Sequence, residues 1–304
     1  MLALVGPTAS GKTEAALAIA ETLGAEIVSV DSMLVYRGMD VGTAKPSAAE
    51  RARVPHHLID LAEPSEPFSV ARYQRAGRVA LDQIARRGSR PMLVGGSGLY
   101  FRALVDQLEF PGTDPDTRAD LELEAAAVGA TGLHRRLAFA DPAAAAKIEP
   151  GNVRRTVRAL EVAAITGREF SSFAEAWERY PPGRVRAAGV ELSRETLVAR
   201  VEARVRAMLD RGFLEEVREL RARGLGRWLT STRAIGYAEM AAHLDGRITV
   251  EDAVRETVSR TKSLARRQMA WFRRDPRIRW FEAGPAGAIE RVDDILEHLE
   301  GGWS

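Results

Sequence analysis

The 304-residue sequence contains no cysteine, and no apolar run in it approaches the length of a transmembrane helix. The absence of cysteine excludes disulfides, thiolate metal ligands and cysteine nucleophiles. The chain begins with a short apolar stretch that leads directly into a loop, which is not the pattern of a signal peptide. We therefore expect a cytoplasmic protein that makes no contact with a membrane.

Lysine is also scarce. Of the 44 lysines and arginines only four are lysine, namely Lys12, Lys45, Lys147 and Lys262. A compact ammonium group and a planar guanidinium bind anions with different geometry, so the two residues are not interchangeable at a binding site. A lysine that is kept in a chain so rich in arginine therefore indicates a position where the ammonium group is needed, and Lys12 lies in the most informative motif.

That motif is GPTASGKT, residues 6–13. The stretch Met1–Val5 predicts a short buried strand, and Glu14–Leu23 has the apolar spacing of a helix. Backbone N–H groups at the start of a helix favour an anion. The sequence therefore predicts a phosphate-binding loop composed of Gly6, Pro7, Thr8, Ala9, Ser10, Gly11, Lys12 and Thr13.

Within this loop Lys12 is expected to reach the outer phosphate oxygens, and the Thr13 hydroxyl is expected to bind Mg²⁺. The alternative is a glycine-rich turn that binds nothing, but the strand before the loop and the helix after it argue against this. Loops of this type usually bind ATP or GTP, so a nucleotide-binding function is the first expectation. The motif by itself does not identify the phosphate compound.

Short apolar runs bounded by turn residues alternate with helical patterns along most of the chain, which predicts an α/β fold with a mostly parallel sheet flanked by helices. The expected strands after the first are Glu26–Val30, Leu58–Leu61, Met92–Gly95, Ala187–Leu192 and Ile278–Phe281. The segment 112–183 breaks the alternation and predicts an inserted all-helical domain. Residues 1–111 and 184–304 would then form a catalytic core related to P-loop NTPases.

Two further motifs fall at the carboxyl ends of expected strands, where open parallel sheets bind their ligands. The expected strand Glu26–Val30 leads into Asp31 and Ser32, and the expected strand Met92–Gly95 leads into the glycine-rich turn that exposes Ser97. Asp31 suits a base or a carboxylate linked to Mg²⁺, whereas the alternative, equally weighted on the sequence, is the N-cap of a helix. The adjacent His56 and His57 are expected to be structural, because no third ligand has metal-site spacing.

Charge is unevenly distributed. The net charge is only +2, yet the segment 255–279 contains nine basic and two acidic residues, a net charge of +7. On a helix over this segment, the side chains of Arg255, Lys262, Arg266 and Arg273 would form one stripe, with Trp271 near enough to stack on a base. A solvated helix face is the alternative. The insertion contributes a second basic surface with Arg118, Arg154, Arg155 and Arg158, and two basic surfaces, one on each lobe, suit a nucleic acid held between them.

Taken together, these residues resemble the tRNA dimethylallyltransferase family, also called tRNA isopentenyltransferases. The stretches that carry the resemblance are GPTASGKT, SVDSMLVYRGMDVGTAKP, HHLIDLAEP, VGGSGLY, RRTVRALEV, STRAIGY and RRQMAW, in family order from residue 6 to residue 271. The phosphate loop alone is common to many enzymes. The combination of DVGTAKP with VGGSGLY and RRQMAW is far more specific.

The resemblance implies transfer of a dimethylallyl group from dimethylallyl diphosphate to the exocyclic N6 amine of the adenosine 3′-adjacent to the anticodon of tRNA, by a monomer that uses Mg²⁺. It implies catalytic roles for Asp31 as the base, Ser97 as a hydroxyl partner, and Lys12 and Arg233 as diphosphate ligands. The residues implied to contact tRNA are Asp31, Ser32, Met33, Leu34, Ser97, Arg118, Arg154, Arg155, Thr156, Val157, Arg158, Arg266 and the segment 234–239.

Three positions depart from the family pattern. Ser97 stands where threonine is usual, and because the hydroxyl is kept we expect activity. Ala238 and Glu239 replace a basic residue followed by glutamine, so these positions are expected to contribute little to tRNA affinity. Ala270 replaces a common threonine. Three alternative functions stay open: a small-molecule kinase, an adenylate isopentenyltransferase, and an RNA-binding protein that uses the loop as a switch.

Overall fold

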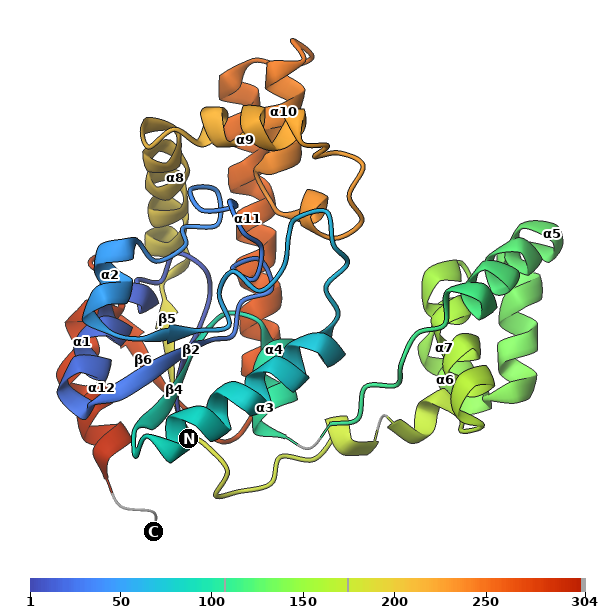
Figure 1. Cartoon of the computed structure of the whole chain (residues 1–304), viewed down its shortest axis with the longest axis horizontal. Coiled ribbons are helices and arrows are strands. Elements are labelled where there is room, and N and C mark those ends of the chain that lie inside the picture. The colour runs from blue at the N-terminus through green and yellow to red at the C-terminus, as the bar shows by residue number, and fades with distance from the viewer. Residues whose placement is uncertain (107, 174, 302–304) are drawn as a thin grey trace. The chain divides into compact units, whose positions relative to one another are not determined.

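The computed structural model describes residues 1–106, 108–173 and 175–301. The chain divides into two compact units, one formed by Met1–Val105 with the chain from Pro181 onward, and the other by Asp106–Tyr180 (Figure 1). The smaller unit overlaps the segment 112–183 that the sequence marks as a helical insertion. Each unit has its own hydrophobic core. No helix in the described residues is long and apolar enough to span a membrane.

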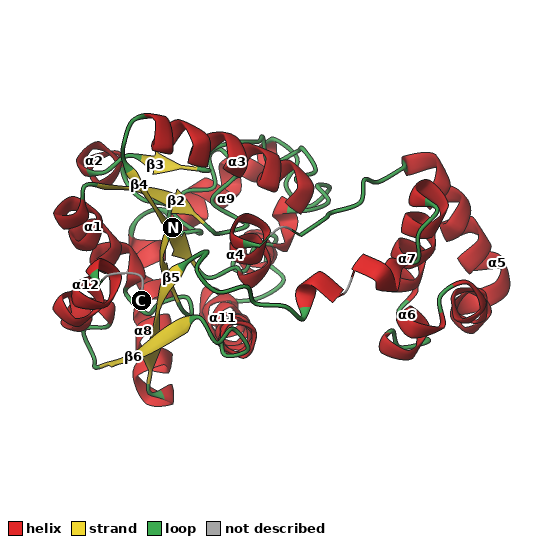
Figure 2. Cartoon of the chain, turned by 90° about the horizontal axis from the view of Figure 1, so that it is seen from below, coloured by secondary structure: helices red, strands yellow, loops and turns green. Residues whose placement is uncertain are grey.

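The larger unit is built on a six-stranded sheet in the order β3-β2-β4-β1-β5-β6, and all the paired strands run parallel (Figure 2). This confirms the predicted fold class. The central strands are buried on both faces, as parallel strands covered by helices usually are. The strands are β1 (Leu2–Val5), β2 (Ala25–Ser29), β3 (His56–His57), β4 (Arg90–Gly95), β5 (Arg186–Leu192) and β6 (Ile278–Ala283).

Helices cover both faces of this sheet (Figure 2). On one face α1 (Lys12–Leu23) and α12 (Val292–Glu300) pack against the strands through a core that includes Ile19, Ile295 and Leu299. On the other face lie α3 (Val70–Arg86) and α4 (Gly98–Val105). The short helix α2 (Ala48–Arg53) precedes β3 and begins with a capping box between Ser47 and Glu50.

A group of helices stands beyond the sheet in the upper part of Figure 1. It consists of α8 (Arg194–Asp210), α9 (Phe213–Ala222), α10 (Tyr237–Leu244) and α11 (Val250–Phe272), with the 3₁₀ turns Ser231–Arg233 and Ala288–Arg291 elsewhere in the unit. The helical patterns predicted over residues 14–23 and 253–272 are confirmed as parts of α1 and α11. These helices supply the walls of the site described below.

The smaller unit is a bundle of α5 (Pro115–Ala140), α6 (Pro142–Lys147) and α7 (Val153–Thr166), followed by 3₁₀ turns at Phe170–Phe173 and Glu175–Trp177. Gly129, with φ 74° and ψ 167°, interrupts the helical conformation within α5. Asp114 and Asp141 cap α5 and α6 and are each followed by proline, a pattern that favours helix initiation. The all-helical character predicted for this segment agrees with these elements.

The strand predicted at Leu58–Leu61 is wrong. The edge strand β3 lies two residues earlier, and Leu58 (φ 64°) and Asp60 (φ 56°) both have left-handed backbone conformations that no strand accommodates. The apolar run that predicted this strand includes Leu58, which is buried at a turn instead. The Asp60 carboxylate is held there by Lys45 at 2.6 Å and Arg51 at 3.0 Å.

Candidate active site

The phosphate loop connects β1 to α1 at the carboxyl edge of the sheet. A side chain at Gly6 is excluded, because its Cβ would lie 2.6 Å from the Val190 carbonyl oxygen, and Gly11 caps α1 with φ 82°. Ala9 also has a positive φ of 64°. The loop residues therefore adopt the conformation that the motif predicts, with backbone amides at a helix N-terminus.

Lys12 is buried within this loop and folds back over it. Its Nζ donates hydrogen bonds to the Pro7 carbonyl at 2.5 Å and to Ser10 Oγ at 3.2 Å. Burial and, to a smaller extent, the charge of Arg204 lower the pKa of Lys12 to about 7, although the charge of Asp31 opposes both effects. An anion that enters the loop would favour the charged ammonium group, because it supplies the compensating charge that the empty loop lacks.

Two arginines on consecutive turns of α8 complete this environment. Arg200 braces the loop, since its Nε donates to the Ala9 carbonyl at 2.8 Å and its Nη1 donates to the Pro285 carbonyl at 2.7 Å. Arg204 faces the site, and burial lowers its pKa. Nothing in the sequence distinguished these two from the many other arginines, because their role depends on where α8 packs.

A cavity of about 500 Å³ opens beside the phosphate loop. Its polar end is formed by the loop and by Asp31, Arg200 and Arg204. Its remaining wall is largely apolar, with contributions from Ala16, Ile27, Leu34, Ala44, Pro46, Ile59, Val94, Ala203 and Ala207. The first cavity therefore combines an anion site with a surface suited to a small hydrocarbon group.

A second cavity of about 500 Å³ adjoins the first. It contains Asp31, Ser32, Met33, Ser97 and Arg233 together with residues of α8 and α11. The two cavities share six lining residues, which are Thr8, Asp31, Thr43, Gly96, Arg204 and Gln268. Asp31 thus lies where the two cavities meet, a position that the sequence motif did not reveal.

The local geometry of Asp31 decides between its two predicted roles. Its Oδ1 accepts a hydrogen bond from the Met33 backbone N–H at 2.8 Å. The residues that follow form turns, and the next helix, α2, begins only at Ala48. Asp31 is therefore not the N-cap of a helix, and its carboxylate is oriented by a local turn at the edge of both cavities.

Gln268 joins the phosphate loop to the second glycine-rich turn. Its Oε1 accepts the Thr8 N–H at 2.8 Å, and its Nε2 would lie 2.3 Å from a Cβ placed at Gly96. A side chain at Gly96 would therefore displace the Gln268 carboxamide from its present position. Ser97, at the start of α4, accepts the Tyr100 N–H at 3.4 Å and lines the second cavity with Asp31. Gln268 belongs to the RRQMAW motif, yet the sequence did not indicate its role.

Arg233 lies on the 3₁₀ turn Ser231–Arg233 and lines the second cavity rather than the first. Its predicted role as a diphosphate ligand is untested and stays a prediction. Glu239 is buried, caps α10 by accepting the Gly236 N–H at 2.9 Å, and pairs with Arg260. Glu239 therefore has a structural role in place of the polar residue usual in the family.

The predicted tRNA contacts in the smaller unit fall into two groups. Thr156 and Val157 are buried in the core of that unit, with exposed fractions of 0% and 3%, so the prediction that these two side chains contact tRNA is wrong. Their place in RRTVRALEV reflects helix packing. By contrast, Arg154 and Arg155 are exposed on α7.

Arg118 and Arg158 are committed to an internal ion pair. Both guanidinium groups donate to Glu161 Oε2 at 2.8 Å, and the Asp114 N–H donates to Glu161 Oε1 at 3.0 Å. Arg158 also donates to the carbonyls of Pro111 and Gly112. These contacts show that the two arginines stabilise the start of α5 against α7, whatever else they bind.

The charge excess of the segment 255–279 is smaller than the sequence suggests. Arg273 pairs with Glu191 at 2.7 Å, while Arg260 and Arg255 pair with Glu239 and Asp252. All three carboxylates lie outside the segment, so the linear count missed them. Arg266 is exposed and donates to Ser263 Oγ at 3.1 Å, which leaves it available to a ligand. Trp271 is 40% exposed and packs beside Gly98.

The two histidines have separate surroundings. His57 bonds to Glu26 at 2.6 Å, and Arg87 pairs with the same carboxylate, so His57 is structural. His56 bonds to the Val54 carbonyl at 2.7 Å, and its ring lines the first cavity. Burial lowers the pKa of His56, which favours the neutral ring. In the described part of the chain, no three or more acidic or histidine side chains gather as a metal site.

The residues present nevertheless fit a magnesium ion. Thr13, Ser29 and Asp31 all line the first cavity, and the Ser29 Oγ is a buried oxygen for which the described residues provide no hydrogen-bond partner. Mg²⁺ prefers oxygen ligands and is commonly held by one or two protein groups, substrate phosphates and water. A full cluster of protein ligands is therefore not required here.

The fold and these cavities define a P-loop-type α/β enzyme whose phosphate site adjoins a second binding cavity. Residues 34–275 match the family model described as IPP transferase, and residues 1–60 match the model described as isopentenyl transferase. The first match covers most of the chain. The chain belongs to the IPP transferase family, and it is therefore a prenyl-transferring enzyme.

Individual relatives agree with this assignment. A protein from Kineococcus radiotolerans named tRNA dimethylallyltransferase is 51% identical over 97% of this chain and 96% of its own length. The solved tRNA isopentenylpyrophosphate transferase of Bacillus halodurans is 39% identical, with a TM-score of 0.71 over 98% of this chain and 96% of its own. A eukaryotic dimethylallyltransferase solved while acting on tRNA has a TM-score of 0.80 over 96% of this chain and 75% of its own, and at 24% identity it supports the fold alone.

The pKa of about 7 at Lys12 predicts that binding of a diphosphate ester requires proton uptake above neutral pH. The empty protein loses this proton as the pH rises, whereas the bound anion favours the ammonium group, so affinity falls with rising pH. A terminal phosphate ionises near pH ~6, so the ligand charge is constant between about pH 7 and 9. Calorimetric titration with dimethylallyl diphosphate should show affinity falling by up to about tenfold per pH unit.

Lys12→Met is the control for this titration, because it removes the titrating group. It should bind more weakly and with little pH dependence over the same interval. An affinity of the unaltered protein that stays constant from pH 7 to pH 9 would contradict the assignment.

A second prediction concerns Glu161. Burial raises the pKa of this carboxyl, but hydrogen bonds from Arg118 and Arg158 outweigh burial and hold the pKa below its ordinary value. A carboxyl whose pKa is lower in the folded than in the unfolded protein stabilises the fold at pH values above its unfolded-state pKa. This contribution is lost as the pH falls through its folded-state pKa. Glu161→Gln should therefore lower the stability of α7 by about 1–3 kcal/mol near neutral pH, with the difference shrinking below about pH 4.

Hydrogen exchange of α7 in the full chain measures this change. Glu122→Gln, on the exposed face of α5, is the matched control and should leave exchange unaltered. Unchanged protection of α7 in Glu161→Gln would show that the ion pair contributes nothing to stability.

Proposed function

We propose that this protein transfers a dimethylallyl group from dimethylallyl diphosphate to the exocyclic N6 amine of the adenosine 3′-adjacent to the anticodon of tRNA, with release of diphosphate. The observation that carries the proposal is the position of Asp31 where the phosphate-loop cavity meets the second cavity. A transfer reaction requires such a meeting point, because the donor and the acceptor must both lie next to the catalytic carboxylate, each bound in its own cavity.

The first cavity suits the donor. The amides of residues 8–13 and the charges of Lys12 and Arg204 would bind the diphosphate, and the apolar wall would bind the five-carbon group. Negative charge builds on the diphosphate as its bond to the allylic carbon breaks, so these donors stabilise the transition state more than the ground state. Mg²⁺ bound near Thr13 would supply further neutralisation of that charge.

The second cavity suits the acceptor base, which must leave the anticodon loop to reach the site. In the reaction the amine nitrogen forms a bond to the allylic carbon as the carbon–oxygen bond to diphosphate breaks. A carboxylate of ordinary basicity does not deprotonate a neutral adenine amine in advance. Asp31 would accept the proton as the nitrogen becomes cationic, and the Ser97 hydroxyl would help to orient the base.

Exposed arginines provide the remaining contacts in this proposal. Arg266 on α11 and Arg154 and Arg155 on α7 are suited to phosphates of the anticodon stem-loop. Arg233, Ser32 and Met33 in the second cavity are suited to the nucleotides around the target base. A single chain contains both cavities, which supports a monomeric enzyme, and a tRNA substrate is consistent with the expected cytoplasmic location.

Two alternative activities share parts of this site. A small-molecule kinase would use the phosphate loop for ATP, but it would not require a largely apolar wall beside that loop. An adenylate isopentenyltransferase would use both cavities, with AMP as the acceptor. The near full-length similarity to proteins named tRNA dimethylallyltransferase favours tRNA as the acceptor over both.

The pure protein incubated with Mg²⁺, dimethylallyl diphosphate and unmodified tRNA should add one five-carbon unit to a single adenosine, as measured by mass analysis of the digested nucleosides. AMP and ATP are the parallel acceptors and should stay unmodified. Prenylated AMP, or ATP hydrolysis without tRNA, would transfer the assignment to one of the two alternatives.

Asp31→Ala should lower turnover by roughly two to four orders of magnitude, because it removes the proton acceptor. Its affinity for tRNA should change little, since Asp31 contributes one side chain to an extended contact. Single-turnover kinetics measure the first effect and filter binding measures the second. Asp31→Asn, which keeps the shape of the side chain, is the control, and near-normal turnover in either variant removes Asp31 from the mechanism.

A further inference from the structure

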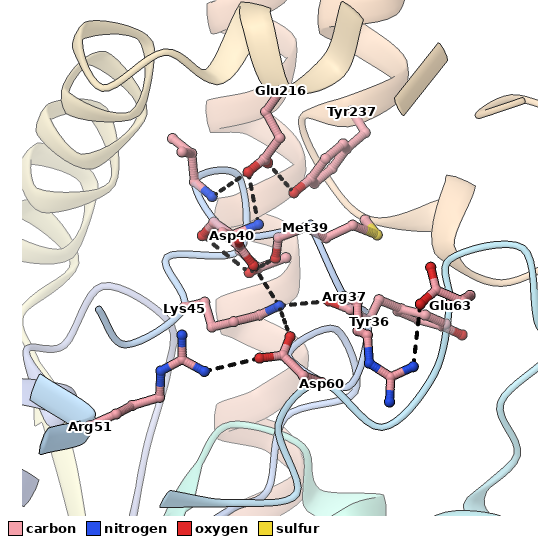
Figure 3. A network of polar contacts seen from close by, with 12 residues as sticks. Tyr36, Arg37, Met39, Asp40, Lys45, Arg51, Asp60, Glu63, Glu216 and Tyr237 are labelled. Atoms are coloured by element: carbon pink, nitrogen blue, oxygen red, sulfur yellow. Dashed lines mark hydrogen bonds and ion pairs between the residues drawn. The ribbon is translucent and has the colours of Figure 1, made fainter. Parts of the chain in front are cut away.

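Glu216, in the first turns of α9, accepts four hydrogen bonds through one carboxylate (Figure 3). Its Oε2 accepts the backbone N–H groups of Asp40 at 2.8 Å and Val41 at 2.7 Å. Its Oε1 accepts the Gly42 N–H at 3.1 Å and the Tyr237 hydroxyl at 2.7 Å. Three successive amides of one loop are thus bound by a single side chain from another part of the chain, through charge-assisted hydrogen bonds.

The loop is seated closely on the helices that carry these groups. A Cβ at Gly42 would lie 2.2 Å from Phe213 Cε2 and 2.7 Å from Tyr237 Cζ, so only glycine fits there. The two rings pack edge to face, with centroids 5.0 Å apart. Burial raises the pKa of Tyr237, which keeps its hydroxyl protonated as a donor to Glu216.

Lys45 fixes the other end of the same loop (Figure 3). Its Nζ lies 2.6 Å from carboxylate oxygens of both Asp40 and Asp60, and it donates to the Tyr36 carbonyl at 2.6 Å. The Lys45 side chain is only 2% exposed. Loop residues 40–45 are therefore held at both ends, by a carboxylate from α9 and by a buried ammonium group.

The middle of this loop is part of the active site. Thr43 lines both cavities, and Ala44 and Pro46 line the first. The Thr43 carbonyl accepts a hydrogen bond from Arg204 Nη2 at 3.3 Å. A displacement of the loop would therefore move the wall shared by the two cavities and remove a hydrogen bond that orients Arg204 beside Lys12 and Asp31.

We propose that Glu216 is a positioning residue of this enzyme, which holds loop residues 40–45 so that Thr43 and Arg204 are placed for binding of the prenyl diphosphate. Glu216 lines neither cavity and acts through the loop. The larger effect is expected on the donor, because the loop contacts Arg204, which lies beside the phosphate loop. The inference rests on the proposed function for its kinetic test, but the placement of the loop is measurable without activity.

Glu216→Gln tests the proposal with a side chain of the same shape. The carboxamide replaces one of the two accepting oxygens of Glu216 with an NH₂ group, which only donates. In one orientation this NH₂ group faces the N–H groups of Asp40 and Val41, and in the other it faces the Gly42 N–H and the Tyr237 hydroxyl. We expect kcat/KM for dimethylallyl diphosphate to fall by about 10- to 100-fold, as for the loss of one or two such hydrogen bonds, while the KM for tRNA stays within about threefold. Tyr237→Phe keeps all three amide contacts and should lower kcat/KM by less than about threefold.

Glu63→Gln is the matched control. Glu63 also connects the segment around this loop to the end of α9, since it pairs with Arg37 at 3.3 Å and Arg223 at 2.9 Å. These are exposed ion pairs, and none of the three residues lines either cavity. Exposed pairs contribute little to stability, so this variant should have normal kinetics.

Three readouts separate positioning from a general loss of structure. Hydrogen exchange at residues 40–42 should accelerate in Glu216→Gln but not in Glu63→Gln, independently of any catalytic activity. The affinity for dimethylallyl diphosphate, measured by calorimetry, should fall in Glu216→Gln and in Arg204→Met, and the double variant should bind about as weakly as Arg204→Met alone, because Glu216 acts through Arg204. Losses that multiply in the double variant, or unchanged exchange at residues 40–42, would overturn the proposal.

Discussion

The burial of one ammonium group imposes the main constraint on this structure. Lys12 lies inside the phosphate loop, where carbonyl and hydroxyl oxygens hold its Nζ, and its pKa is lowered to about 7. Burial of a charge without a full counter-charge is costly, and Arg204 adds a second positive charge nearby. The loop is therefore best satisfied by a ligand that supplies two or more negative charges, which a diphosphate does.

The rest of the larger unit brings the other groups of the site together around this charge. Parallel strands bring the phosphate loop, Asp31 and Ser97 to one edge, because each follows the carboxyl end of a strand. Helices α8 and α11 then close the site from residues more than 180 positions away in the sequence, with Arg200 and Gln268 hydrogen-bonded to the phosphate loop itself. The two adjoining cavities are consequences of this closure.

Carboxylates that line neither cavity stabilise the packing within each unit. Glu216 fixes the loop that forms the shared wall, Glu239 caps α10 while it pairs with Arg260, and Glu161 joins two helices of the smaller unit. In a chain so rich in arginine, the buried carboxylates of Glu161 and Glu239 neutralise part of the positive charge. The exposed arginines that remain are those available to a polyanion.

Local sequence determined those features that depend on short-range chemistry. GPTASGKT implied the phosphate loop because its glycines allow the positive φ values that this backbone path needs, and the alternation of apolar runs implied a parallel sheet because buried strands need continuous apolar residues. The family resemblance rested on such stretches and is confirmed.

Only tertiary packing decided the rest. Leu58–Leu61 turns instead of extending, because Lys45 and Arg51 hold Asp60. Thr156 and Val157 are buried because they lie on the face of α7 that packs into the core of its unit. Arg204, Gln268 and Glu216 have roles at the site because elements distant in the sequence pack together. A linear pattern does not encode these contacts, since the partner of each residue lies on another element.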